Sequence, residues 1–211
     1  MNEHIYTSRY DLVIKVRWLK YRKIVRLNHQ FVITMKSKDI AIVGILLAIG
    51  AILRYFLAML HTPLTPNMII AFYCLAIILI RPKVLEALGI GIVAGILSML
   101  ISSSMFPPAN LISEPVGALV CFGLYAAIQA RTKLAPSVTT FISTLASGFT
   151  FAGIAIAFVG ATVLASPKYN GDLMAFVAVF VPIVVITAVF NAIIVQILYI
   201  PSSRALLRGQ E

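Results

Sequence analysis

Charged residues are scarce in this chain, and acidic residues are the scarcest. Asp and Glu number 7 against 17 Lys and Arg, and charged residues make up 11% of the 211 residues. A soluble domain usually carries about 25% charged residues. Together with 61% hydrophobic residues and a mean hydropathy of +1.00, this scarcity excludes a soluble globular protein, a disordered chain and a disulfide scaffold. It indicates one polytopic membrane domain without a soluble catalytic domain.

Residues typical of catalysis and metal binding are few and scattered. Cys74 and Cys121 lie in separate apolar runs, and His4, His29 and His61 do not cluster. A cysteine-based metal site needs clustered ligands. The sequence contains no Gly-x4-Gly-Lys-Ser/Thr run for an ATP phosphate cradle and no evident Ser/His/Asp set. It therefore predicts no metal site, no cofactor and no enzymatic activity.

Six apolar segments are candidates for membrane crossing, which takes about 20 helical residues. They cover residues 40–60, 68–80, 84–102, 111–130, 138–165 and 173–200. The second is short, and spans only with help from Pro66–Asn67, by thinning the bilayer or by being shielded by its neighbours. We therefore predict an all-α membrane protein with six transmembrane helices.

Lys and Arg alternate between the loops. Residues 1–39 hold nine, 61–67 none, 81–83 two, 103–115 none, 131–137 two, 166–172 one and the C-terminal tail two. Such a bias orients membrane proteins with the positive side in the cytoplasm. We predict a multi-pass protein of the cell membrane with both termini cytoplasmic. Because the net charge of +10 is explained in this way, no nucleic-acid partner is expected.

Residues 1–38 form a basic segment ahead of the predicted membrane domain at 39–211. The segment lacks the long apolar core of a signal peptide. Two interpretations remain. The segment is either a juxtamembrane arm that touches anionic lipid or an upstream extension, with translation starting at Met35. N-terminal mass spectrometry distinguishes them.

The first predicted helix carries a face of small residues: Ala41, Gly44, Ala48 and Ala51. At 100° per residue they lie within an arc of about 80°. Small residues let another helix approach closely in lipid. The face packs either against the chain's own helices or against a separate membrane partner.

Two charged residues lie near the predicted external side. Arg54 is about 21 Å from the cytoplasmic end of its helix, where a charge must snorkel or find a partner. It snorkels outward, binds a substrate carboxylate or pairs with Glu114. Glu114 opens the fourth segment, where it either caps the helix N-terminus or contacts a substrate amine.

Several motifs carry a resemblance to a known family. They are Pro66-Asn67-Met68, Gly89–Leu97, the stretch from Pro108 to Glu114, and Phe180-Val-Pro182 followed by Asn191. With six segments and a small-residue first helix, the chain from about Lys36 to Arg208 resembles the substrate-binding S components of energy-coupling factor (ECF) transporters. It is most similar to their tryptophan-transporter branch.

The resemblance implies a subunit of an ATP-driven importer. Such a subunit captures a small molecule, here tryptophan, in an external pocket and delivers it inward with a transmembrane coupling subunit and two cytoplasmic ATPases. The family's coupling contact is an Ala-xxx-Ala pair, to which Gly44 and Ala48 correspond here, with Gly in place of the first Ala. A vitamin or cofactor precursor as cargo, a stand-alone facilitator and a membrane scaffold stay open as alternatives.

A tryptophan zwitterion needs a cation, an anion and a stacking surface. We assign Arg54 to the carboxylate and Glu114 to the amine. Among the uncharged residues, Asn67 and Asn110 provide polar orientation, and Phe106 and Tyr169 provide stacking or lid closure.

Overall fold

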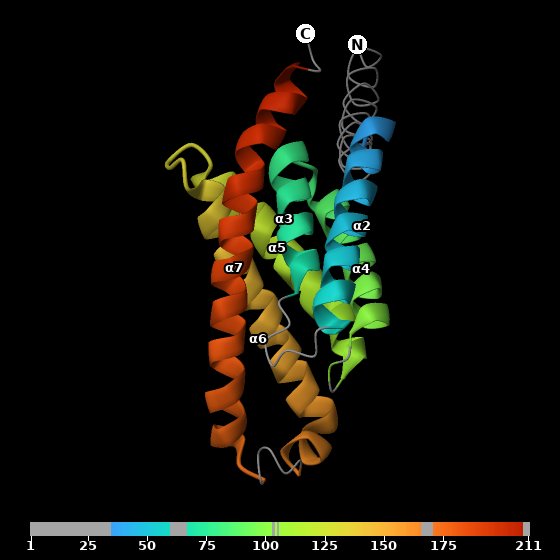
Figure 1. The fold of residues 1–211 in the computed structure, drawn as a ribbon, viewed down its shortest axis with the longest axis vertical. Coiled ribbons are helices and arrows are strands. Elements are labelled where there is room, and N and C mark those ends of the chain that lie inside the picture. The colour runs from blue at the N-terminus through green and yellow to red at the C-terminus, as the bar shows by residue number, and fades with distance from the viewer. Residues whose placement is uncertain (1–34, 60–66, 103, 105, 166–170, 209–211) are drawn as a thin grey trace, which may run out of the picture. The chain divides into compact units, whose positions relative to one another are not determined.

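The computed structural model describes residues 35–59, 67–102, 104, 106–165 and 171–208. Its elements are α2 (Ser37–Met59), α3 (Met68–Ile80), α4 (Val84–Ile101), the 3-10 turn η1 (Pro107–Ala109), α5 (Asn110–Ile128), α6 (Ala135–Leu164) and α7 (Leu173–Arg208) (Figure 1). Residues 1–34 lie outside this part of the chain. The division at 38/39 and the start at Met35 therefore stay predictions.

The predicted all-α membrane fold is confirmed. Five helices are long and apolar enough to cross a membrane, and α3 is a shorter apolar helix. The boundaries differ most at α7, which continues through Pro201 to Arg208. The hydropathy pattern predicts an end at Ile200, because the helical residues that follow it begin with Pro201 and several polar side chains.

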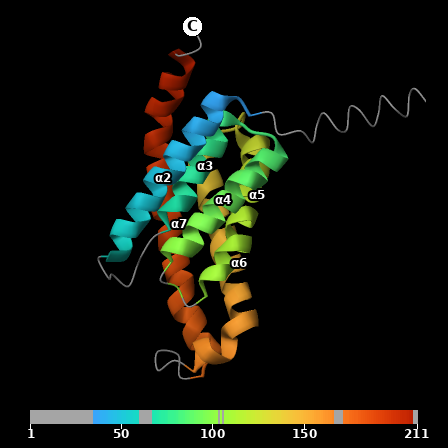
Figure 2. The same cartoon turned by 90° about the vertical axis from the view of Figure 1, so that its right-hand side faces the viewer.

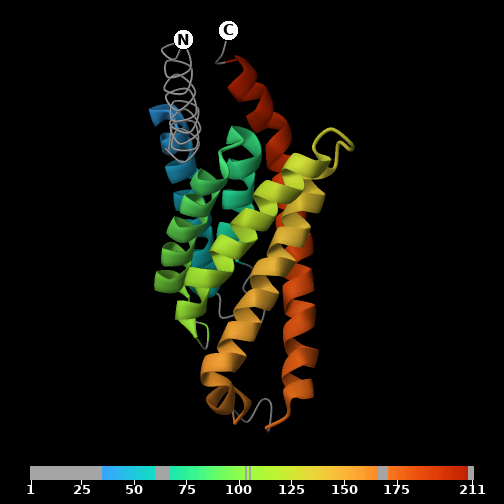
Figure 3. The same cartoon turned by 180° about the vertical axis from the view of Figure 1, so that it is seen from behind.

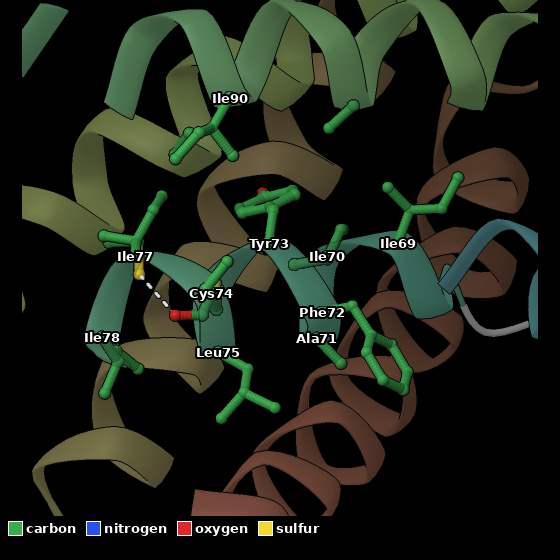
Figure 4. Packing of buried hydrophobic residues seen from close by; sticks show 14 of the residues in the cluster. Ile69, Ile70, Ala71, Phe72, Tyr73, Cys74, Leu75, Ile77, Ile78 and Ile90 are labelled. Carbon is green, nitrogen blue, oxygen red and sulfur yellow. Dashed lines mark hydrogen bonds between the residues drawn. The ribbon is translucent and has the colours of Figure 1, made fainter. Parts of the chain in front are cut away.

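The short helix α3 is the centre of the bundle. It contacts each of the other five α-helices, and every residue from Met68 to Ile78 is buried. Figure 4 shows its side chains packed between neighbouring helices, with the Cys121 thiol directed at the Cys74 carbonyl oxygen. Protein surrounds α3 where lipid would otherwise lie, so 13 residues suffice where a lipid-exposed span needs about 20.

Consecutive helices run in alternating directions, so the start of α2 and the end of α7 lie at the same end of the bundle (Figures 1 and 2). At the opposite end, α6 and α7 run side by side beyond the ends of α4 and α5 (Figure 3). The turn Arg81–Lys83 and the connection between α5 and α6 are at the end where α2 starts. Arg81, Lys83, Arg131 and Lys133 therefore lie at the same end of the described helices.

Glycines on α4 allow close packing against the start of α5. A Cβ atom on Gly95 would lie 2.7 Å from the Asn110 carbonyl oxygen, and one on Gly91 would lie 2.7 Å from the Cα atom of Pro115. Ordinary side chains at these positions would force the helices apart. The close approach brings Ser98 of α4 within reach of Glu114.

The small-residue face of α2 is divided. Ala41, Gly44 and Ala48 are exposed, and a Cβ atom on Gly44 would meet no described residue within 4 Å. Ala51 is buried. Its neighbour Gly50 packs so closely on α3 that a Cβ atom added to it would lie 3.1 Å from the Cβ atom of Phe72. Ala51 therefore belongs to the chain's own packing, and three of the four predicted docking residues stay exposed.

Candidate functional site

A cavity of about 260 Å³ lies where α2 and α4 end and α5 begins. Its polar lining comes from these helices, from the middle of α6, from α7 and from the residue that precedes α3. The polar residues are Arg54, Asn67, Ser102, Ser104, Asn110, Ser113, Glu114, Thr144, Ser147 and Thr187. Small-molecule pockets usually measure about 300–1,000 Å³, so this cavity suits an amino-acid-sized ligand better than a large cofactor.

Glu114 is the centre of a hydrogen-bond network in the cavity wall. Its Oε1 accepts hydrogen bonds from the Asn67 side-chain amide and from the Ser98 hydroxyl at 3.3 Å. Its Oε2 accepts one from the Ser147 hydroxyl at 3.0 Å. These bonds join α5 to the start of α3, to α4 and to α6, so a buried carboxylate fixes the relative positions of four helices.

Of the two roles considered for Glu114, the capping role is wrong. The 3-10 turn runs directly into α5, which begins at Asn110 and has no acidic residue in its first turn. Glu114 consequently lies inside the helix and is only 1% exposed. The predicted segment begins at residue 111, one residue after α5 begins, so Glu114 lies inside that segment and was wrongly assigned to the helix start.

Arg54 supplies the positive charge of the cavity lining. Its Nη1 atom is buried and has no hydrogen-bond partner in the described part of the chain. The Glu114 carboxylate belongs to the lining of the same cavity. The side chain therefore turns into the protein and does not snorkel outward. A buried N–H without an acceptor is costly, and a ligand carboxylate would satisfy it.

Two amide side chains leave acceptors free next to this pair of charges. The Asn191 amide donates to the Asn67 carbonyl oxygen at 3.2 Å and to the Thr144 hydroxyl at 3.3 Å. The Oδ1 atoms of Asn67 and Asn191 are buried and have no partner among the described residues. An amide oxygen accepts hydrogen bonds, so Asn67, which lines the cavity, offers an acceptor to a ligand amine.

The other three predicted site residues differ in how they relate to the cavity. Asn110 lines the cavity, but its amide donates to the Pro107 carbonyl oxygen at 2.7 Å, which closes the turn before α5. Phe106 stacks on Phe158 with ring centroids 5.8 Å apart and is not among the cavity-lining residues. Tyr169 lies outside the described residues.

Sequence reasoning missed the aromatic lining of the cavity. Phe151 of α6 and Phe180 of α7 line it, and Phe180 stacks on Phe176 at 5.3 Å. Nothing separates these rings from other phenylalanines in apolar segments. A usable signal was present on α6, where the hydroxyl residues Thr140, Thr144 and Ser147 recur at helical spacing and so mark a face turned away from lipid.

These features define a multi-pass membrane protein whose helices enclose a small cavity lined by opposite charges. The chain belongs to the tryptophan transporter TrpP family, whose family model matches residues 36–207. A similar relative is a probable tryptophan transport protein of Bacillus subtilis (strain 168), which is 33% identical over 178 residues, covering 82% of this chain and 95% of the relative. No solved structure matches the chain.

Family membership confirms the resemblance to the tryptophan-transporter branch. It makes the chain a substrate-specific membrane transporter. It also indicates transport rather than catalysis.

Proposed function

We propose that this chain binds tryptophan in the cavity between Arg54 and Glu114 and carries it across the membrane. The main support for this proposal is the buried Nη1 atom of Arg54, which has no hydrogen-bond partner among the described residues. The wall of the same cavity also contains the buried Glu114 carboxylate. An amino-acid zwitterion has complementary charges, with its carboxylate suited to the guanidinium. Its ammonium group is suited to Glu114 and to the free Oδ1 of Asn67.

The indole ring is assigned to the apolar wall of the same cavity. Phe151 and Phe180 supply ring faces and edges, and Ile183 and Val184 extend this wall along α7. Aromatic pairs contribute about 0.5–1.5 kcal/mol beyond the burial of their area. The name of the Bacillus subtilis relative supports tryptophan as the cargo.

Ligand analogues test this assignment. Isothermal titration of the purified full chain in mild detergent is expected to show binding of tryptophan. Tryptamine, without a carboxylate, and indole-3-propionate, without an amine, should each bind at least about tenfold more weakly, because each loses a charged contact worth about 1.4 kcal/mol or more. Equal affinity for all three ligands would contradict recognition of the zwitterion. If none binds, mass spectrometry of co-purified small molecules decides whether a vitamin or another compound is the cargo.

We further propose that transport is driven through partners, as in ECF importers, by a transmembrane coupling subunit and two cytoplasmic ATPases. The sequence has no phosphate-binding loop of its own. Its spans hold few acidic residues for an ion relay. The basic loops support an orientation with both termini cytoplasmic. Ala41, Gly44 and Ala48 offer an exposed small-residue surface to a partner helix.

Replacing Gly44 with Leu is expected to abolish tryptophan uptake in cells while tryptophan binding by the purified chain is unchanged. A Cβ atom on Gly44 meets nothing within 4 Å in the described part of the chain, so a leucine there is expected to interfere with an external helix. Gly123→Leu on α5 is the matched control, because this glycine is also exposed and also has open space around its ideal Cβ. Normal uptake by Gly44→Leu, or uptake into liposomes by the chain alone, would instead favour a facilitator.

A further inference from the structure

A second cavity, of about 570 Å³, lies at the other end of α5 from Glu114. It is bounded by the last turns of α5, the start of α6 and the C-terminal part of α7. The residues that characterise it are Tyr125, Arg131, Lys133, Gln196, Tyr199 and Arg204. The proposed transport site uses none of them, so this cavity needs an explanation of its own.

The cavity has a strong positive charge. Arg131 and Lys133 come from the connection between α5 and α6, and Arg204 comes from α7, while the described residues that line the cavity include no Asp or Glu. The guanidinium of Arg81 adds a fourth positive charge at the edge, where it lies 5.9 Å from the centre of the Tyr125 ring. Like charges that converge without a carboxylate between them favour a bound anion.

Hydrogen bonds between helices hold this cavity in shape. The Ser137 backbone N–H donates to the Gln196 side-chain oxygen at 3.3 Å, and the Gln196 amide donates to the Lys133 carbonyl oxygen at 3.4 Å. α7 is thereby tied to the start of α6. The hydroxyl oxygens of Tyr125 and Tyr199 lie 3.5 Å apart. Guanidinium, ammonium and phenol groups together form a donor set that matches phosphate oxygens.

The surroundings of the cavity point to a phosphate that carries acyl chains. Large apolar side chains are exposed directly beside the basic residues: Leu134 is 56% exposed, Ile197 63% and Ile200 47%. α5, α6 and α7 are all apolar enough to span the membrane, so the cavity at their ends lies near the headgroup level. Basic pockets between transmembrane helices at this level suit anionic lipid headgroups.

We propose that this cavity binds the headgroup phosphate of an anionic phospholipid, whose acyl chains lie along the exposed apolar face of α7. Arg131, Lys133 and Arg204 neutralise the phosphate, and the Tyr199 hydroxyl donates a hydrogen bond to it. Such a lipid would join α5, α6 and α7 at the end where Gln196 already links α7 to the start of α6. The proposal is independent of the identity of the transported molecule.

Lipid titration of the purified full chain in mild detergent tests the proposal. Native mass spectrometry is expected to show one tightly held phosphatidylglycerol and no comparable phosphatidylcholine, and phosphatidylglycerol alone should raise the unfolding temperature. Lys133→Gln/Arg204→Gln should weaken phosphatidylglycerol binding by about tenfold or more. Lys36→Gln/Lys38→Gln removes the same charge from exposed residues outside the cavity and should leave phosphatidylglycerol binding unchanged.

Tyr199→Phe keeps every charge but removes the hydroxyl donor. It should weaken phosphatidylglycerol binding severalfold.

Four results would overturn the proposal. Equal losses in the two lysine-containing double variants would show diffuse attraction rather than a site. Equal binding of phosphatidylglycerol and phosphatidylcholine would remove the role of charge. Competition by inorganic phosphate at the lipid's own concentration would identify a free-phosphate site. Loss of uptake in Lys133→Gln/Arg204→Gln with lipid binding unchanged would assign the cavity to a protein partner. The unfolding temperature of each variant in phosphatidylcholine shows whether the variant is folded. The comparison of the two lipids on the unmodified chain tests the proposal even if a variant fails to fold.

Discussion

Arg54→Gln is expected to weaken tryptophan binding by about thirtyfold or more. The substitution removes the positive charge of the cavity lining, and with it the buried Nη1 that has no acceptor in the described part of the chain. Truncating one partner of a buried, hydrogen-bonded charge pair costs about 2–5 kcal/mol, and each 1.4 kcal/mol is about a factor of ten in affinity. Isothermal titration in detergent measures the change.

The comparison with tryptamine separates recognition from structure. Tryptamine has no carboxylate, so its affinity should change much less than that of tryptophan when Arg54 is replaced. Arg54→Lys should recover only part of the binding, because lysine keeps the charge but lacks the planar fork that holds a carboxylate with two bonds. Arg81→Gln, at the other end of the bundle, removes one positive charge far from the cavity and serves as the control. If Arg54→Gln weakens both ligands equally, Arg54 holds the site together and does not contact the carboxylate.

The sequence predicts the membrane architecture well because lipid restricts what a chain can do. Backbone groups in the bilayer must bond within the chain, which leaves helices for apolar segments of this length. The helix Met68–Ile80 was predicted with these bounds. Its central position was not, because an apolar run of 13 residues looks the same whether lipid or protein surrounds it. Contact with the other five α-helices is a property of the packing.

Prediction of the cavity residues succeeded where polarity was conspicuous. Arg54 and Glu114 stand out because charge is rare and costly in a membrane segment, and both line the cavity together with Asn67 and Asn110. Phe151 and Phe180 could not be predicted as cavity residues, because the sequence does not show whether a phenylalanine in an apolar segment faces lipid or a ligand. Phe106, which we predict to provide stacking or lid closure, stacks on Phe158 and is not among the described residues that line the cavity.

The partners of Glu114 also depend on packing that the sequence does not display. Ser98 donates to its carboxylate because Gly95 and Gly91 let α4 approach the start of α5 closely. The sequence shows the glycines, but not which helix they face. A charged residue at a helix start is usually read as an interaction with the helix dipole. At Glu114 the hydrogen bonds from three other segments outweigh that local interpretation.

Glu114→Gln is expected to lower both tryptophan affinity and stability. An amide of the same shape puts a donor in place of one of the two carboxylate oxygens, both of which accept hydrogen bonds, and it leaves Arg54 without a compensating charge. Hydrogen bonds to charged groups are each worth about 1.5–3 kcal/mol, so the unfolding temperature should fall by about 3 °C or more. Tryptophan should bind about thirtyfold more weakly, while indole-3-propionate, which has no amine, should lose much less. Thermal unfolding and titration of both ligands measure these effects.

Ser147→Ala provides a control for Glu114→Gln, because it removes the 3.0 Å hydrogen bond to Oε2 and keeps the carboxylate charge. It should cost less affinity for tryptophan than Glu114→Gln does. A loss as large as that of Glu114→Gln would mean that the geometry of the network, and not the charge, controls binding.

The double variant Arg54→Gln/Glu114→Gln distinguishes the structural role of the two charges from their role in recognition. A single substitution leaves one buried charge without its counter-charge, which is more costly than removing both. The double variant should therefore be more stable than the sum of the single effects predicts, because the two residues interact. Tryptophan binding should stay at least as weak as in either single variant, since both charged groups that suit the zwitterion are gone. Recovery of tryptophan affinity together with stability would show that the two charges hold helices in place and that the ligand is recognised by other groups.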